Sequence, residues 1–534
     1  MQIRMKNIVK NLCVASILAG SLTGCTGDFE EMNKNPLQTT EVSPALLFPI
    51  VLQEGFNNRW DNYQLGENLH SNQYCQYIAN TTSYFSSDRY AWNDGWVSGG
   101  YWDPYYTSVM KDYRIVEEQI KEKPEYTNLF QIMRIYTAMC TAKMTDLFGD
   151  IPYSNAATGE QQPSFDSQKD IYYNVFKELT EAVEILQSGL SLQTNYGESD
   201  YMFRGDEAKW IKFANSLRLR FAIRLSFIDP VKAKAEGEAA LAAGVMSNAS
   251  DKAELETNKD YGTGLGFPMY TLCYWNEFRM SKTMENIMKN TSSVEDPRLP
   301  VWFGMTESFN KGTSAVKFQG VRNGLPSDQT SLDGNKAADN SNIWGLAFAP
   351  TWNSEGIEPA GWLTYPHNVM NYAEVCFLKA EAAIRGWNGA GSAKANYEEG
   401  IRQSFASARW NINTALLDIT KDETYITTGK VAWDESADFE GKLERIITQK
   451  WIALFPNGNE AWAECRRTGY PKLAPVVQSD ESTINPSNGE FIKKLRYTDD
   501  EKRINEANAT SSTLNSGQGD GLSVRVWWDT KRYK

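Results

Sequence analysis

A repeated helical spacing of apolar residues constrains the fold of this 534-residue chain more than any other feature. The clearest stripe, in residues 171–187, consists of Tyr172, Val175, Leu179, Val183 and Leu186. The same spacing recurs in residues 129–147, 207–226, 371–386 and 441–455. Intervals of three and four residues place side chains on one face of a helix, so each stretch predicts an amphipathic helix that buries one stripe.

Several of these stretches have a second helical segment close behind them. The pairs are 207–226 with 231–243, 371–386 with 393–409, and 441–455 with 459–467. Short connections favour helical hairpins that stack on one another, although no clean 34-residue consensus is present. We therefore expect a mainly α fold, with a tetratricopeptide-like helical-hairpin scaffold, long loop-rich insertions and few short strands.

The rest of the chain is rich in turn-forming Gly, Asn, Asp, Ser and Pro but has no linker-like tract. We expect one unit over residues 25–534. Its helical scaffold should cover about 107–255 and 368–470, and its loop-rich regions about 55–106 and 256–367. Many tryptophans lie in the loop-rich regions: Trp60, Trp92, Trp96, Trp102, Trp275, Trp302, Trp344, Trp352 and Trp362.

The N-terminus has the pattern of a secretory signal peptide over residues 1–24. Basic Arg4, Lys6 and Lys10 precede an apolar stretch at 12–19, which is too short to cross a hydrocarbon layer of roughly 30 Å. Residues 22–25 (LTGC) then resemble the lipobox of bacterial lipoproteins, in which the cysteine is acylated. This predicts lipidation of Cys25; the alternative is an ordinary signal with an incidental cysteine.

An acidic cluster follows at Asp28, Glu30 and Glu31 and is similar to the surface-export signal of Bacteroidetes lipoproteins. The whole chain has a net charge of −13, with its lysines and arginines scattered among carboxylates. Such a distribution disfavours nucleic acid and anionic lipid surfaces as partners. The cysteines beyond Cys25 are far apart without a CxxC pair, so we expect small core residues rather than a disulfide framework or a zinc site.

Several longer motifs, in order along the chain, closely resemble the SusD/RagB family. They are DPRLP at 296–300, VMNYAEVCFLKAEAA at 369–383, QKWIALF at 449–455, EAW at 460–462, RRTGYP at 466–471 and RVWWD at 525–529. The resemblance implies an outer-membrane protein that is lipid-anchored and exposed at the cell surface. It also implies a SusC-like TonB-dependent transporter as partner, to which the protein presents nutrient, usually an oligosaccharide. No catalysis and no cofactor are implied.

The motifs themselves predict scaffold positions. Trp451, Phe455 and Trp462 lie on helix faces and should be core residues, and Glu381 and Arg466 are candidates for an ion pair. Only His70 and His367 are available as histidines, and no hydrolase, zinc or nucleotide motif is present. A glycoside hydrolase needs only two carboxylates, so it stays a remote alternative.

The loop at 84–96 combines aromatic and amide side chains, as sugar binding requires. The family carries such residues to its glycan site in the loop after the first long helix, which makes Trp92, Asn93 and Trp96 the positions implied here. Residues 93–95 form a turn-like sequence, so the two rings could emerge as adjacent platforms. The alternative is that these tryptophans fix the loop onto the scaffold, the role we expect for Trp102.

Two further loops supply Tyr270, Trp275 and Trp352 as candidate ligand contacts. An open arc of rings favours an oligosaccharide over the other cargo known in the family, a peptide carried by a RagB-like importer. The identity of the glycan is not encoded in any motif.

Overall fold

The computed structural model describes residues 42–189, 193–257, 267–343, 345–346, 351–353, 356–358, 365–410 and 412–533. The predicted signal peptide, Cys25 and the acidic cluster lie outside these residues. No helix in the described ranges is long and apolar enough to cross a membrane.

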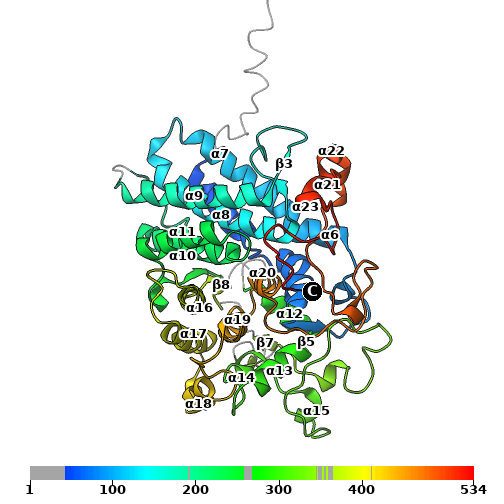
Figure 1. Ribbon diagram of the computed structural model, residues 1–534. Helices are drawn as coiled ribbons and strands as arrows, with labels where there is room; N and C mark the ends of the chain where they lie inside the picture. Colours follow the sequence, from blue (N-terminus) through cyan, green and yellow to red (C-terminus); the bar gives the residue numbers. More distant parts are fainter. Residues whose placement is uncertain are drawn as a thin grey trace, which may run out of the picture.

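Four helical hairpins form the scaffold. They are α8 (Thr127–Phe148) with α9 (Gln168–Gln187), α10 (Glu207–Leu225) with α11 (Pro230–Ala243), α16 (Tyr372–Ile384) with α17 (Ala393–Ala408), and α19 (Phe439–Ala453) with α20 (Gly458–Thr468). The first three hairpins follow one another down one side of the molecule (Figure 1). The predicted helices and their pairing are confirmed, each within a few residues of its expected bounds.

Side-chain caps fix the starts of these helices. Ser167 accepts a hydrogen bond from the Asp170 N–H at 3.2 Å, and Asn371 accepts one from the Glu374 N–H at 2.9 Å. Asp206, Asp438 and Asn457 cap α10, α19 and α20 in the same way. Each cap satisfies a backbone donor that the helix leaves open, which is why the helices begin where the sequence changes from polar to periodic.

Shorter helices connect and cover the scaffold. They are α3 (Pro44–Gly55), α4 (Trp60–Tyr63), α5 (Ser71–Tyr74), α6 (Asp94–Val97), α7 (Lys111–Gln119), α12 (Met269–Trp275), α13 (Lys282–Asn290), α14 (Leu299–Trp302), α15 (Glu307–Asn310), α18 (Lys421–Thr427), α21 (Asp499–Ile504), α22 (Glu506–Ala509) and α23 (Leu514–Gly517). Three π-helical segments, η1 (Gln64–Asn68), η3 (Ser98–Trp102) and η4 (Tyr105–Met110), lie in the N-terminal part. Much of the loop-rich chain gathers on the side opposite the hairpins, around α6, α12, α13, α15 and α21–α23 (Figure 1).

The described strands form four two-stranded antiparallel sheets. They pair β1 (Ile78–Asn80) with β5 (Phe278–Met280), β2 (Ile151–Pro152) with β3 (Phe165–Asp166), β4 (Ala253–Leu255) with β8 (His367–Met370), and β6 (Thr351–Asn353) with β7 (Gly356–Glu358). The expectation of a mainly α fold with few short strands is confirmed.

The core contains the residues that the helix motifs predicted. Trp451 and Trp462 are fully buried, and Phe455 and Trp102 nearly so. The described cysteines are buried and unpaired: Cys75, Cys140, Cys273, Cys376 and Cys465. Their role as small core residues is therefore confirmed.

A buried charge cluster joins the last three hairpins. It consists of Arg220, Arg224, Glu374, Glu381, Lys450, Glu460, Glu464 and Arg467, contributed by α10, α16, α19 and α20. Arg467 donates to both oxygens of Glu381, at 2.8 and 2.7 Å, and to both oxygens of Glu464, at 2.9 and 2.6 Å. Burial alone would raise the pKa of the Glu464 carboxyl, but the cations around it, Arg467 first, hold that pKa well below its usual value.

The prediction of an ion pair between Glu381 and Arg466 is wrong. Glu381 binds Arg467 and Arg385, whereas Arg466 donates to the backbone carbonyls of Asp146 and Lys493 and lies 3.9 Å from the Trp462 ring centroid. Consecutive residues of an α-helix point about 100° apart, so only one of the two arginines can face α16.

Candidate functional site

The pairing of β1 with β5 brings two loop-rich segments together. Asn80 lies opposite Phe278, so the residues that follow β1 run beside the residues that precede β5. The Thr81 hydroxyl donates to the Glu277 carbonyl at 3.1 Å, which extends the contact beyond the strands. Residues about 195 positions apart therefore share one face of the molecule.

The loop after β1 is shaped by the side chain of Asn80. Its amide donates to the carbonyls of Thr82 and Phe85 at 2.9 and 2.8 Å, and its oxygen accepts from the N–H and hydroxyl of Thr82. Asp88 fixes the far end of the loop, since its carboxylate accepts from the N–H groups of Asn80 and Gly324. Burial raises the pKa of Asp88 to about 6.

A close backbone contact places a third segment in the same region. Segments η1 and η3 meet at Gly66 and Gly100, where a Cβ atom on Gly100 would lie only 2.2 Å from the Gly66 nitrogen. Asn57 donates to the Gly100 carbonyl at 2.7 Å and holds this approach. Because only glycine permits the contact, these positions set how α4, which precedes η1, sits against α6, which precedes η3.

The three segments contribute an aromatic loop cluster, which we define as Trp60, Tyr84, Phe85, Trp96 and Trp275. Trp60 and Trp275 meet edge to face with ring centroids 5.4 Å apart. Phe85 contacts Tyr84 at 4.8 Å and Trp96 at 5.9 Å. Tyr84 is 62% exposed and Trp275 41% exposed, so both rings are open to a ligand.

Polar groups lie directly beside the exposed rings. The Tyr84 hydroxyl donates to Glu277, and partial burial together with this carboxylate raises the pKa of Tyr84 to about 12. Asn276, in the left-handed conformation at the end of α12, is exposed between Trp275 and Glu277. Arg279 donates to the Asn276 carbonyl at 2.7 Å and so fixes this turn. Flat rings flanked by a carboxylate and an amide can stack on a sugar ring and bind its hydroxyls.

The structure separates the residues expected from the 84–96 loop. Residues 94–97 form helix α6 rather than a turn, and the Asn93 side chain caps it by accepting from the Trp96 N–H at 3.1 Å. Trp96 belongs to the aromatic loop cluster. Trp92 is half-buried, and the Arg496 guanidinium carbon lies over its ring, 5.9 Å from the ring centroid. Residues 93–95 are therefore the start of a helix rather than a turn, and the two rings have different neighbours.

Among the other candidates, Trp275 lies in the aromatic loop cluster. Tyr270 falls in α12 and Trp352 in β6, but both side chains lie outside the described residues. Sequence reasoning missed Trp60, Tyr84 and Glu277 as site residues. The neighbouring aromatic residues 84–85 and the WNEF sequence at 275–278 were visible signals, but the contact between them depends on the β1–β5 pairing.

Both histidines are buried. Burial lowers the pKa of His70 to about 4 and that of His367 to about 3, so both rings are neutral at pH 7. His70 bonds to backbone carbonyls and His367 to Asn58. In the described part of the chain, no group of three or more His, Cys, Asp or Glu side chains is placed to hold a metal ion.

The family described as SusD-like, Susd and RagB outer membrane lipoprotein, matches residues 27–529. The chain belongs to the SusD/RagB family. A chitin-binding SusD homolog from Flavobacterium johnsoniae is 30% identical over 92% of this chain and 99% of its own, with a TM-score of 0.76. A SusD homolog from Parabacteroides distasonis is 26% identical over 92% of this chain and 99% of its own, with a TM-score of 0.79.

A SusD-like protein from Bacteroides thetaiotaomicron is 25% identical over the same shares of the two chains, with a TM-score of 0.75. None of the curated proteins matches this chain. The chain thus belongs to a family described as outer membrane lipoproteins, with SusD homologues in Bacteroidetes, and it is built on a helical tetratricopeptide-like fold.

Proposed function

We propose that this SusD/RagB protein binds an oligosaccharide at the aromatic loop cluster and delivers it to a SusC-like TonB-dependent transporter without chemical change. The single observation that supports the site best is the exposure of Trp275 and Tyr84 beside Glu277. Membership of the SusD/RagB family, whose members are binding proteins rather than enzymes, supports binding over hydrolysis.

Chitin fragments are the first ligands to test. One similar structure is a chitin-binding SusD homolog, and another, 26% identical, is named a chitin-binding protein. A chain of β-linked sugars presents a C–H face that could stack on Trp275 and Tyr84. Its hydroxyl and amide groups could then bond to Glu277 and Asn276.

The proposed delivery requires attachment to the outer membrane through Cys25 and exposure at the cell surface. In cells fed labelled palmitate, Cys25→Ala should remove the label from the protein. Mild detergent should extract the wild-type protein together with the transporter, and protease added to whole cells should digest it. Retention of label by Cys25→Ala, or protection of the protein in intact cells, would contradict this part of the proposal.

The binding proposal is tested on a glycan array with residues 26–534, followed by calorimetry on the best glycan. Trp275→Ala should lower the affinity for that glycan about tenfold, because one stacked ring contributes roughly 1–2 kcal/mol to binding. Trp527→Ala is the matched control, since Trp527 is half-buried outside the cluster. If Trp275→Ala binds the glycan as tightly as wild type, the binding site does not include Trp275. Binding of peptides alone would favour a RagB-like peptide importer. Release of shorter glycans would indicate hydrolysis.

A further inference from the structure

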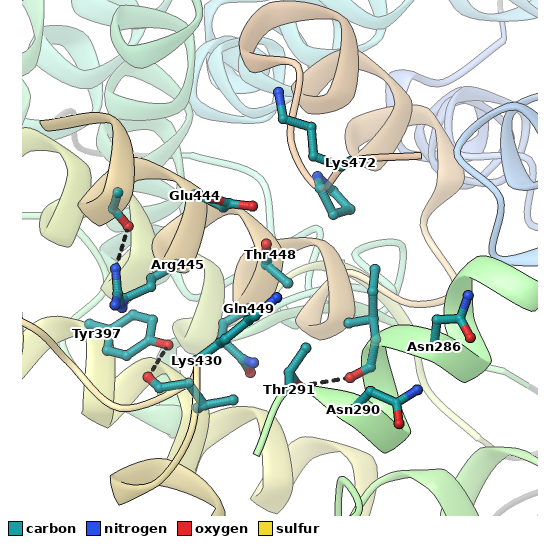
Figure 2. A pocket seen from close by; sticks show the side chains of 14 residues that line it. Asn286, Asn290, Thr291, Tyr397, Lys430, Glu444, Arg445, Thr448, Gln449 and Lys472 are labelled. Carbon is teal, nitrogen blue, oxygen red and sulfur yellow. Dashed lines mark hydrogen bonds between the residues drawn. The ribbon is translucent and has the colours of Figure 1, made fainter. Parts of the chain in front are cut away.

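A second candidate binding site lies between the helices of the scaffold and α13. The cavity there has a volume of about 510 Å³ and is lined by residues of α13, α17 and α19 and of two loops. Figure 2 shows α13 and α19 on opposite sides of it, with Lys472 on a loop above them. Its volume falls within the roughly 300–1,000 Å³ typical of small-molecule sites. None of the residues of the aromatic loop cluster lines it.

The backbone around this cavity is held in place. Gly429 has φ +63°, and the N–H groups of Lys430 and Val431 donate to the Thr291 carbonyl at the end of α13, at 2.7 and 3.2 Å. Tyr397 of α17 donates to the Val431 carbonyl at 2.7 Å. This loop is therefore fixed to both α13 and α17.

The opposite rim is equally constrained. Gly469 has φ +75°, and a Cβ atom there would lie 2.6 Å from the Arg532 carbonyl oxygen, so the chain turns sharply after α20. The next residue, Tyr470, donates to Glu440 of α19 at 3.1 Å. These contacts place Pro471 and Lys472 over α19 before any ligand arrives.

The side chains that end in the cavity contrast with this fixed backbone. Asn286 and Asn290 lie one helical turn apart on α13, and Glu444 and Thr448 do the same on α19. Among the described residues, none of these four side chains has a hydrogen-bond or ion-pair partner within the protein. The ammonium groups of Lys430 and Lys472 are likewise without a carboxylate partner in the described part of the chain, and Lys472 only contacts the Tyr470 ring.

The charges around the cavity differ in sign from the chain as a whole. The lining includes Lys430, Arg445 and Lys472 but only one carboxylate, Glu444, in a chain with a net charge of −13. Arg445 is fixed by the Ala432 and Gly441 carbonyls, with Asp434 at 3.6 Å. The two lysines therefore remain available for an anionic ligand.

We propose that this cavity binds an acidic oligosaccharide, of about the size of a uronic acid dimer. Lys430 and Lys472 pair with its carboxylates from the two loops. Asn286, Asn290 and Thr448 form hydrogen bonds with its hydroxyls. Glu444 accepts hydrogen bonds from further hydroxyls, which a simple anion could not donate. The site is separate from the aromatic loop cluster and does not depend on the function proposed for it.

The test is calorimetry of the mature protein with three probes: a dimer of galacturonic acid, a neutral disaccharide and inorganic phosphate. We expect the acidic dimer to bind, with affinity that falls as salt concentration rises, and the other two to bind at least about tenfold more weakly. The double variant Lys430→Ala/Lys472→Ala should lose binding of the acidic dimer by about tenfold or more. Its melting temperature should not change, because both side chains are exposed.

Lys394→Ala is the matched control, an exposed lysine of α17 that does not line the cavity. Trp275→Ala should also leave binding of the acidic dimer unchanged, which separates this site from the aromatic loop cluster. Absence of binding, equal binding of the neutral disaccharide, or an unaltered affinity in the double lysine variant would overturn the proposal. If phosphate binds as tightly as the acidic dimer, the cavity is a general anion site, and the proposal that it binds a saccharide is overturned.

Discussion

The buried charge cluster of the scaffold and the aromatic loop cluster use polar side chains in opposite ways. In the scaffold, Arg467 and Glu464 are fully buried and each makes several short contacts with oppositely charged groups. In the loops, Trp275 and Tyr84 keep exposed surface, while Glu277 has one oxygen bonded to Tyr84 and the other buried. Charges paired within the protein contribute to stability, whereas rings left exposed are available to a ligand.

The largest effect should come from removing a member of the buried charge cluster. Arg467→Ala would leave Glu381 and Glu464 facing each other without their shared cation. We expect a loss of about 3–5 kcal/mol in the free energy of unfolding, measured by chemical denaturation. Arg503→Ala, which removes an exposed ion pair with Asp500, should cause no measurable loss. If the two variants are equally stable, the buried charge cluster contributes no more to stability than an exposed ion pair does.

A buried carboxyl whose pKa is raised should respond to pH in the opposite sense to Glu464. Burial raises the pKa of Glu67 to about 7, although Lys143 and two backbone amides oppose the shift. Unfolded Glu67 loses its proton near pH 4.5, well before the folded side chain does, so its contribution to stability falls as pH rises from about 4.5 to 7.

Glu67→Gln removes this titration. Relative to wild type, the variant should therefore gain up to about 2–3 kcal/mol in the free energy of unfolding between pH 5 and pH 8. Glu464 has a lowered pKa, so the stability it contributes is present above about pH 4.5 and is lost as pH falls further. Denaturation curves at both pH values check this, and a pH-independent difference for Glu67→Gln would contradict the raised pKa.

The two tryptophans of the 92–96 segment sharpen the comparison within the loops. Trp96→Ala should weaken binding of the glycan found on the array about tenfold, because its ring belongs to the aromatic loop cluster. Trp92→Ala should weaken it less than about threefold, since its ring contacts Arg496 instead. Calorimetry and melting temperature are measured together for both. If Trp92→Ala loses more affinity than Trp96→Ala, Trp92 is the ligand contact and Trp96 is not.

The smallest effect is expected from the Tyr84 hydroxyl. Tyr84→Phe keeps the ring but removes the hydrogen bond to Glu277, so glycan affinity should change by less than about fivefold. Tyr84→Ala, which also removes the ring, should lose about tenfold. Calorimetry with the same glycan compares the two, and equal losses would show that the hydroxyl, not the ring, makes the contact.

The sequence by itself determined the helical scaffold and its core. Periodic apolar positions act over a few turns, so a local pattern was enough to predict α9, α10, α16 and α19 and the burial of Trp451 and Trp462. The same pattern could not choose between Arg466 and Arg467 as the partner of Glu381. That choice depends on how α20 is rotated against α16.

Only the tertiary structure decided which loop residues meet. Trp96 and Trp275 are 179 positions apart and belong to one surface because β1 pairs with β5 in one register. Trp60 joins them through its ring contact with Trp275, and the cavity at Lys430 and Lys472 is likewise assembled from segments distant in the chain. Such contacts between distant residues depend on the register and close approach of backbone segments, which no local sequence pattern specifies.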